Sequence, residues 1–283
     1  MTRESDELRD CEVVVTRAPH QQAALSVPLA RRGAQVIAAP VIHLAPPPPP
    51  GDHCYQEGSW MRPINEVGAA LQSFSWLIFT SANAVRLTHE RWRGLGGLDG
   101  LCASWGAHFP AVVCVGSATQ RALSDLGVKG SVIPKAFHAE GIVELLSTRS
   151  IDTQKILIPR ALVARETLPE ALRARGAEVW VSPVYQTLPL SLSPQVRAHI
   201  LSPARPKVRY LTFTSDSTLR YFTDQFSAQE IKALRVDTRV IVIGPIVEQS
   251  ATSVGLPARR IAHPHTVEGL IDAISADQRE ITQ

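Results

Sequence analysis

Short runs of small, hydroxylated and glycine residues recur in this chain directly after apolar segments that are typical of buried strands. A helix usually begins at such a point, and the backbone N–H groups of its first turn have no partner within the helix. Those N–H groups bind carboxylates or phosphates. The sequence therefore indicates a site for an anionic ligand, with these expected residues: Arg17, Thr80, Ser81, Ala82, Asn83, Gly116, Ser117, Ala118, Arg160, Thr214, Ser215, Gly244 and Pro245.

Each of these residues also has a simpler interpretation. Ser, Thr and Asp before a helix are first of all caps, each worth about 1 kcal/mol. Basic side chains on a surface are ordinarily solvated. For any single position these explanations are the better ones, so the case for a site depends on the recurrence of such strand ends in both halves of the chain.

Other kinds of catalytic site have little support in the residue pattern. The four cysteines have no C-x-x-C spacing, which disfavours a disulfide framework and a zinc site. The His-Pro-His segment at residues 263–265 is interpreted as a surface turn, because a metal needs three or four ligands. The glycine-rich segment at residues 94–100 lacks a nucleotide-binding register and is interpreted as a loop. We expect no metal and no cofactor.

Composition narrows the class of protein. A chain of 283 residues with 45% hydrophobic content is expected to form two domains. No segment approaches the ~20 apolar residues that span a bilayer. The polar start has no signal-peptide pattern, so we expect a cytoplasmic location and no membrane partner. A net charge of +3, spread along the chain, disfavours a nucleic-acid partner.

Two segments, residues 13–44 and 156–187, repeat one pattern. Each begins with the apolar run of a buried parallel strand and continues into a helix with leucines four residues apart, which lie on one face. A glycine then ends the helix in the left-handed conformation. A second strand follows, and it is expected to end at Pro40 or at Pro183.

The rest of the two halves matches as well. An apolar strand that leads into Thr-Ser and a helix begins at Trp76 and again at Arg209, and a strand-glycine-helix segment begins at Val112 and again at Val240. Each half is therefore a βα, βα, βα, β, α series. Such a series predicts an α/β class with two similar doubly wound parallel sheets. Ligands of these sheets bind outside the carboxyl ends of the strands.

A proline-rich insertion, residues 45–63, follows the first repeat. Its five consecutive prolines are expected to form an extended spacer of about 15 Å. A stiff spacer at this point indicates that the chain passes from one domain to another just after Leu44. The remaining large residues of the insertion are expected in a loop: Cys54, Tyr55, Trp60 and Met61.

Taken together, these residues resemble the uroporphyrinogen-III synthase family. The resemblance extends over about residues 13–274, without the insertion. Its most specific motifs are F-T-S-A-N-A-V, V-G-S-A-T, L-I-P-R, P-V-Y-Q-T and I-G-P. Each motif alone is weak, whereas their order and spacing together are specific.

The resemblance implies two similar α/β domains joined by two short β-linkers, at residues 40–44 and 183–187. Domain one would then be discontinuous and comprise residues 1–44 and 188–283, with residues 45–187 forming domain two. Periodicity alone does not predict this double crossing.

The activity that the resemblance implies is the cyclisation of hydroxymethylbilane, a linear tetrapyrrole with eight carboxylates, to uroporphyrinogen III in the cleft between the domains. Ring D is inverted and water is lost, so the enzyme would be a lyase of porphyrin and heme biosynthesis. Because the substrate cyclises unaided to the wrong isomer, the task would chiefly be orientation, which needs no strong acid or base.

Two catalytic residues are implied by the same resemblance. Tyr185 of P-V-Y-Q-T would help the hydroxyl leave, because a phenol is protonated at neutral pH and can donate. The alternative is that Tyr185 packs on the linker strand. Thr119 of V-G-S-A-T would orient a substrate carboxylate. The family resemblance also implies a monomer, with a transient contact to the preceding pathway enzyme left open.

Two departures from the family pattern keep a second function open. Ile246 and Val247 follow I-G-P where the family commonly has Thr, and Ala161 follows Arg160 where the family often has Gly. The alternative function is a non-catalytic relative that binds or senses a tetrapyrrole.

Overall fold

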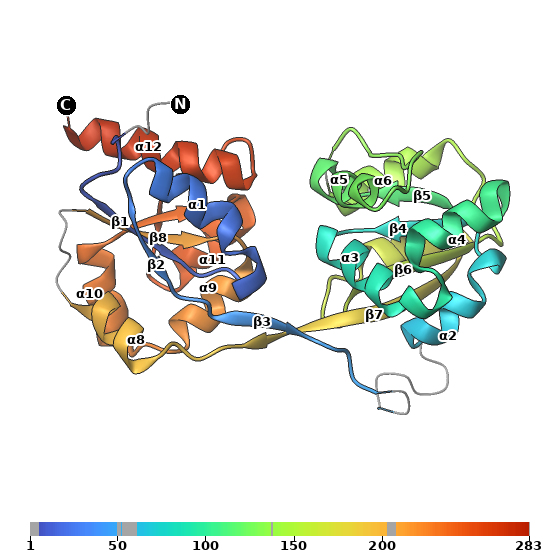
Figure 1. Ribbon diagram of the computed structural model, residues 1–283, viewed down its shortest axis with the longest axis horizontal. Coiled ribbons are helices and arrows are strands. Elements are labelled where there is room, and N and C mark those ends of the chain that lie inside the picture. Colours follow the sequence, from blue (N-terminus) through green and yellow to red (C-terminus); the bar gives the residue numbers. More distant parts are fainter. Residues whose placement is uncertain (1–5, 50–51, 53–60, 137, 203–207, 283) are drawn as a thin grey trace. The chain divides into compact units, whose positions relative to one another are not determined.

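The structure is a computed structural model that divides by its contacts into two compact units (Figure 1). Unit one comprises Met1–Leu44 and Leu188–Gln283, and unit two comprises Ala45–Thr187. The residues that the structure describes are 6–49, 52, 61–136, 138–202 and 208–282. Cys54, Tyr55 and Trp60, which the sequence predicts in a loop, lie outside the described residues.

Unit one contains a five-stranded sheet in the order β10-β9-β8-β1-β2. All four strand pairs are parallel. The strands are β1 (Cys11–Val15), β2 (Gln35–Ala38), β8 (Val208–Phe213), β9 (Arg239–Val242) and β10 (Ala258–Ile261). The helices are α1 (Ala23–Arg31), α8 (Pro194–Leu201), α9 (Asp216–Thr223), α10 (Ala228–Asp237), α11 (Pro245–Ser253) and α12 (Val267–Thr282).

Helices cover both faces of this sheet, because successive strand side chains point to opposite faces. Val14 packs in a core with α8, α9, α10 and α11. Val13 and Val15 pack in a second core with α1 and α12. The strands are therefore apolar on both faces, as in other buried parallel sheets.

Unit two contains a second five-stranded sheet in the order β3-β7-β6-β4-β5. The pairs β4–β5, β4–β6 and β6–β7 are parallel. The strands are β3 (Ile42–Ala45), β4 (Trp76–Phe79), β5 (Ala111–Cys114), β6 (Lys155–Ala161) and β7 (Glu178–Pro189). The helices are α2 (Ile64–Ala69), α3 (Ala82–Arg91), α4 (Gly97–Trp105), α5 (Ser117–Asp125), α6 (Ala139–Ser147) and α7 (Thr167–Arg173). The predicted α/β class with two parallel sheets is confirmed.

The repeated segments fold as predicted up to their second strands. The paired leucines of α1 and α7 are buried. Gly33 and Gly176, which follow these helices, have φ of +92° and +83°, the left-handed region that favours glycine. The first β-strand of each segment then pairs with the second as a parallel neighbour, β1 with β2 and β6 with β7.

The prediction that Pro183 ends the second strand is wrong. β7 continues through Pro183 to Pro189, and Pro183 pairs with Arg160 of β6. The register of the pair shifts between Arg160 and Ala161. A proline lacks only its N–H, so a strand tolerates it next to such an irregularity. Pro40, in contrast, lies between β2 and β3 as predicted.

Two further predictions are corrected, and one strand was missed. Residues 97–100 of the glycine-rich segment begin α4 instead of forming a loop. Leu98 and Leu101 are buried on that helix, and burial of an apolar face favours a helix over a loop. Met61 pairs with Val181 of β7 as an isolated bridge instead of lying in a free loop. β10 has no counterpart in the predicted series of elements.

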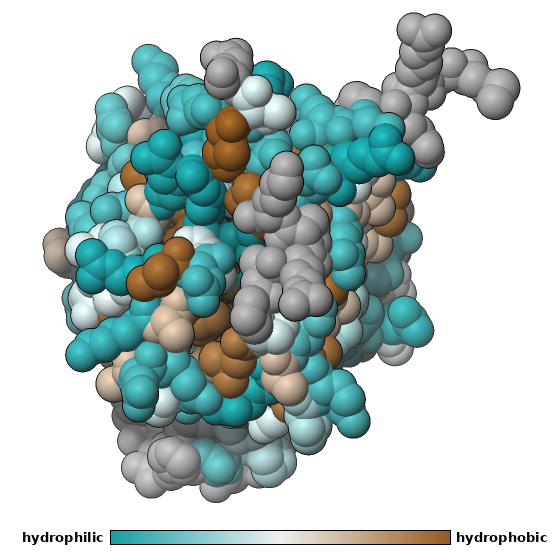
Figure 2. Space-filling model, turned by 90° about the vertical axis from the view of Figure 1, so that its left-hand side faces the viewer, coloured by the Kyte–Doolittle hydropathy of each residue, from teal (hydrophilic) through white to brown (hydrophobic). Residues whose placement is uncertain are grey.

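The face shown in Figure 2 is mainly hydrophilic, with small groups of hydrophobic side chains between the polar ones. Single exposed apolar residues such as Val236, which is 82% exposed, are common in proteins and need no partner to explain them. Among the described residues, no helix is both long and apolar enough to cross a membrane.

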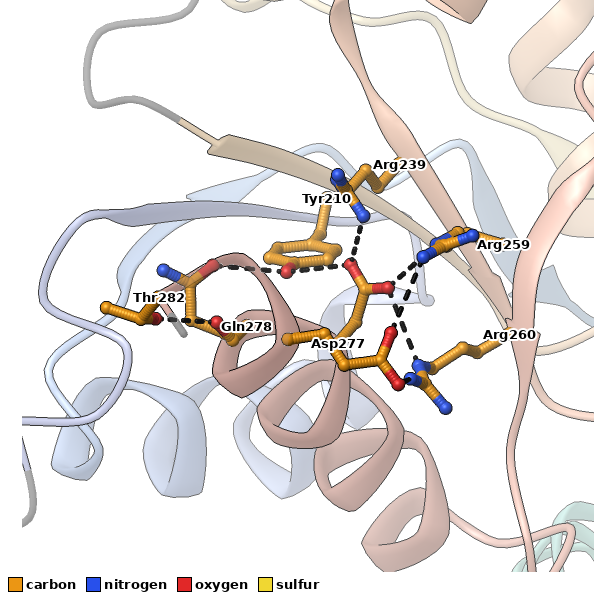
Figure 3. A network of polar contacts seen from close by, with 8 residues as sticks. Tyr210, Arg239, Arg259, Arg260, Asp277, Gln278 and Thr282 are labelled. Carbon is orange, nitrogen blue, oxygen red and sulfur yellow. Dashed lines mark hydrogen bonds and ion pairs between the residues drawn. The ribbon is translucent and has the colours of Figure 1, made fainter.

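Helix α12 is tied to three neighbouring strands of unit one by the buried carboxylate of Asp277 (Figure 3). Asp277 Oδ2 accepts hydrogen bonds from the Tyr210 hydroxyl (3.1 Å) and from Arg239 Nη1 (2.9 Å), and Oδ1 accepts one from Arg259 Nε (3.0 Å). Burial, and then the charge of Asp277, raise the pKa of Tyr210 well above its usual value, so the phenol remains a donor.

The Asp277→Asn variant is expected to lose about 3 kcal/mol of unfolding free energy, because a buried amide has one acceptor oxygen in place of two and no charge for the Tyr210, Arg239 and Arg259 donors. The matched control is Asp272→Asn on the same helix, whose partner Arg32 lies 3.2 Å away and whose side chain is 63% exposed. That exposed pair contributes less than about 1 kcal/mol. Urea titrations compare the three proteins, and equal losses for the two variants would contradict a special role for Asp277.

Candidate active site

The carboxyl ends of three neighbouring strands of unit two surround a cavity of about 150 Å³. Thr80 follows β4, Val115 follows β5, and Ile158 and Arg160 belong to β6. Helix and loop residues complete the wall. The full lining is Thr80, Val115, Ala139, Ile158, Arg160, Ala164, Arg165, Leu168 and Pro169. The structure thus brings together Thr80 and Arg160 of the predicted residues, at the edge where ligands of such sheets bind.

Arg160 is an internal side chain, only 3% exposed. Its Nη1 donates to the Arg165 carbonyl oxygen at 2.8 Å, and its Nη2 donates to the Glu166 carboxylate. These contacts brace the loop between β6 and α7. The sequence predicted Arg160 as a direct substrate ligand, whereas two of its three nitrogens already bind the protein.

Arg165 is exposed and lines the same cavity. Its backbone is held by the Arg160 guanidinium, and the structure assigns its side chain no ion pair within the described residues. The sequence left the role of Arg165 undetermined. Arg165 can be identified from Arg160, the buried arginine five residues earlier. The burial of Arg160 is apparent only in the folded structure.

Tyr185 lies on β7, 9% exposed, opposite Ala161 of β6. Its carbonyl oxygen accepts a hydrogen bond from Leu162 N–H at 2.8 Å. Because this pairing follows directly after the register shift at Arg160, Tyr185 is placed beside the start of the braced loop. The structure therefore brings Tyr185 and Arg160 into the same end of the β6–β7 pair.

Ser81 and Ser215 use their hydroxyls as helix caps. Ser81 Oγ accepts from Ala84 N–H (3.1 Å) at the start of α3, and Ser215 Oγ accepts from Thr218 N–H (3.2 Å) at the start of α9. Ser215 also donates its own N–H to Thr218 Oγ1. For these two hydroxyls the capping interpretation is correct. What α3 can still offer a ligand is backbone N–H groups of its first turn, which contains Ala82 and Asn83.

Helices α5 and α11 begin differently, because Gly116 and Gly244 occupy their N-cap positions and supply no side-chain oxygen. Ser117 and Ala118 are exposed in the first turn of α5, and Pro245 is exposed at the start of α11. In unit two this arrangement leaves first-turn N–H groups available to an anion. Pro245 has no N–H, so α11 offers one donor fewer.

Thr119 and Val247 occupy equivalent positions, three residues after these two glycines. Thr119 is 3% exposed and Val247 is 5% exposed. Val247 belongs to a hydrophobic core of unit one, while its neighbour Ile246 is 51% exposed. Position 247 therefore lacks a hydroxyl on a buried face of α11. Thr119, which the sequence predicts as a catalytic residue, has its hydroxyl on the corresponding face of α5.

The matching edge of unit one contains Arg17, Thr214 and Ser215. Threonine hydroxyls join β1 to β8 just inside this edge, since Thr16 Oγ1 donates to the Thr212 carbonyl and Thr212 Oγ1 donates to the Val14 carbonyl, both at 2.7 Å. Arg17 is half-buried, and its carbonyl accepts from Gln22 Nε2 at 2.8 Å. The edge is therefore ordered by side-chain hydrogen bonds to main-chain carbonyls.

His265, which the sequence predicts in a surface turn, lies near this edge in an exposed bend. A Cβ atom added to Gly244 would lie 3.7 Å from its ring, and its Nδ1 lies 2.8 Å from the Ala262 carbonyl oxygen. Within the described residues no group of His, Cys, Asp and Glu could hold a metal ion.

The two cysteines that lie in strands, Cys11 and Cys114, are unsuited to act as nucleophiles. Burial raises the pKa of Cys114, at the end of β5, to about 11. Burial, with a smaller effect of the nearby acids Asp10 and Asp277, raises the pKa of Cys11 to about 12. Because the thiolate is the reactive form, both thiols are inert at neutral pH.

The family comparisons agree with this architecture. The family model "Uroporphyrinogen-III synthase HemD" matches residues 23–272. "Uroporphyrinogen-III synthase" of Synechococcus elongatus is 29% identical over 278 residues, covering 95% of this chain and 96% of the relative. "Putative uroporphyrinogen-III synthase" of Methanothermobacter thermautotrophicus is 26% identical over 272 residues, covering 95% of this chain and 99% of the relative.

Solved structures share the fold. The uroporphyrinogen III synthase mutant from Thermus thermophilus has a TM-score of 0.61 at 14% identity, and the synthetase from Helicobacter pylori has a TM-score of 0.57 at 19% identity. Each comparison covers 95% of this chain and 99% of the other. With a family model that spans most of its length, the chain belongs to the uroporphyrinogen-III synthase family.

Proposed function

We propose that this chain converts hydroxymethylbilane into uroporphyrinogen III, with inversion of ring D and loss of water. The observation that carries the proposal is the family match over residues 23–272, which includes the predicted strand-end residues of both units except Arg17. The enzyme is a cyclising lyase of porphyrin biosynthesis. A monomeric state, a cytoplasmic location and a transient contact with the preceding pathway enzyme stay predictions.

Backbone donors are the part of the site that suits this substrate. The helix N-termini at Gly116 and Ser81 lie at one edge of the unit-two sheet, and those at Ser215 and Gly244 lie at the corresponding edge of the unit-one sheet. An octacarboxylate needs many anion contacts, and helix N-termini supply them with few full charges. We infer that both edges bind carboxylates of one substrate molecule.

Orientation is the main catalytic contribution that we infer. The hydroxymethyl group loses its hydroxyl as water, and ring D attacks the resulting carbon through its substituted position. Holding ring D in that geometry converts a random encounter into a directed one, which can contribute roughly 7 kcal/mol or more in well-oriented reactions. No nucleophilic side chain is required.

Tyr185 is the proposed donor to the leaving hydroxyl. It lies beside the braced loop of unit two, at the end of the buried stretch of β7, with its side chain 9% exposed. A phenol O–H can donate a hydrogen bond to a leaving oxygen. Thr119, Arg17 and the residues of the predicted edges are proposed to position carboxylates.

The first test supplies freshly made hydroxymethylbilane and resolves the porphyrin isomers after oxidation. The type III isomer is expected to predominate, because the enzyme directs ring D before spontaneous closure occurs. Formation of type I alone would refute the synthase. In that case a titration with uroporphyrinogen III tests the alternative, a tetrapyrrole-binding protein without turnover.

The Tyr185→Phe variant is expected to lower kcat by about 10²-fold or more, the usual contribution of a proton donor, while KM changes little. The control is Tyr221→Phe, a partly buried tyrosine of α9 that stacks with Arg220. Initial rates and thermal midpoints of both variants are compared with the parent. Unchanged kcat in Tyr185→Phe would leave this tyrosine with the packing role only.

The Thr119→Val variant is expected to fold normally, because valine occupies the equivalent buried position 247 in unit one. If the hydroxyl orients a carboxylate, KM rises by about 10-fold or more, the value of a hydrogen bond to a charged group. Thr119→Ser retains the hydroxyl and is expected to restore KM. Equal KM values for Thr119→Val and the parent would exclude the orienting role.

A further inference from the structure

The cavity of unit two combines apolar walls with polar groups on its rim. Val115, Ile158 and Leu168 contribute apolar side chains from three different elements. Thr80 adds a hydroxyl, and Arg160 and Arg165 add guanidinium groups. A largely apolar pocket with a few convergent polar groups is the usual form of a small-molecule site.

Within the described residues, one side-chain nitrogen of Arg160 in this wall has no hydrogen-bond partner. Its side chain is 3% exposed, and its Nε is buried without a hydrogen-bond partner in the part of the chain that the structure describes. The two Nη atoms are satisfied by the Arg165 carbonyl and Glu166. A buried donor without a partner costs about 1–3 kcal/mol, so an acceptor at this wall would stabilise the site.

Arg165 supplies the accessible charge. Arg160 is matched by Glu166, whose side chain is 46% exposed. Of the two arginines that line the cavity, Arg160 is paired with Glu166, so the exposed Arg165 carries the positive charge that is left at the mouth.

The size of the cavity limits its occupant. A cavity of about 150 Å³ lined by aliphatic groups accommodates a molecule the size of benzene. A propionate arm has fewer heavy atoms than benzene, and an acetate arm has fewer still. Both combine methylene groups for the walls with a terminal carboxylate for the guanidinium groups.

We propose that this cavity is a subsite for one acetate or propionate arm of the tetrapyrrole substrate. The methylenes pack against Val115, Ile158 and Leu168, and the carboxylate binds the Arg165 guanidinium at the mouth. Arg160 is a positioning residue that holds the Arg165 backbone. The inference rests on the proposed function, since it names where that substrate places one of its arms.

The Arg165→Ala variant tests the subsite, with Arg165→Lys as the charge-conserving variant. The matched control is Arg121→Ala, an exposed arginine of α5 in the same unit that is absent from the cavity wall. KM and kcat for hydroxymethylbilane, the isomer ratio and the affinity for uroporphyrinogen III under anaerobic conditions are measured for each. Circular dichroism checks that every variant is folded.

Arg165→Ala is expected to raise KM and the dissociation constant of uroporphyrinogen III about 10-fold or more, with kcat within about twofold. Arg165→Lys is expected to recover part of the loss, and Arg121→Ala to match the parent. Equal affinity of Arg165→Ala and Arg121→Ala overturns the subsite. If the parent makes only type I isomer, the proposed function fails separately, and the uroporphyrinogen III affinities still decide the subsite.

Discussion

Parallel pairing between strands that are distant in the sequence is the constraint on which both units depend. In unit one, β1 pairs with β8, so that Val14 lies beside Leu211 although the whole of unit two separates them along the chain. Because the strands are parallel, all their carboxyl ends reach one edge, and the next helices begin there. The edge proposed to bind the substrate is therefore a consequence of strand direction, not of any single motif.

The two units show which parts of that edge serve the fold. Serine hydroxyls cap α3 and α9 in the same way, and glycine takes the cap position of α5 and α11. Thr119 in α5 and Val247 in α11 occupy the equivalent buried helical position of the two units. Both units provide main-chain N–H groups at these helix N-termini. Such donors suit a substrate that carries many charges and that must be held in one orientation to react.

Charged side chains divide between the two ends of the sheets. At the strand starts of unit one, Asp277 joins α12 to Tyr210, Arg239 and Arg259, and a buried Glu12–Arg209 pair joins β1 to β8. These contacts join neighbouring elements and stabilise the fold. At the strand ends of unit two, Arg160 binds the Arg165 carbonyl and Glu166, and its Nε has no hydrogen-bond partner within the described residues.

The α/β class, the helix caps, the left-handed Gly33 and Gly176, and the family were determined by the sequence alone, because they depend on local periodicity, local backbone conformation and motif order. Three features were decided only in the tertiary structure: the continuation of β7 through Pro183, the helix at residues 97–100 and the internal position of Arg160. Each depends on a neighbour that is brought close by folding. β6 accommodates the proline through a shifted register, burial of Leu98 outweighs the glycines, and the Arg165 carbonyl and Glu166 bind the Arg160 guanidinium.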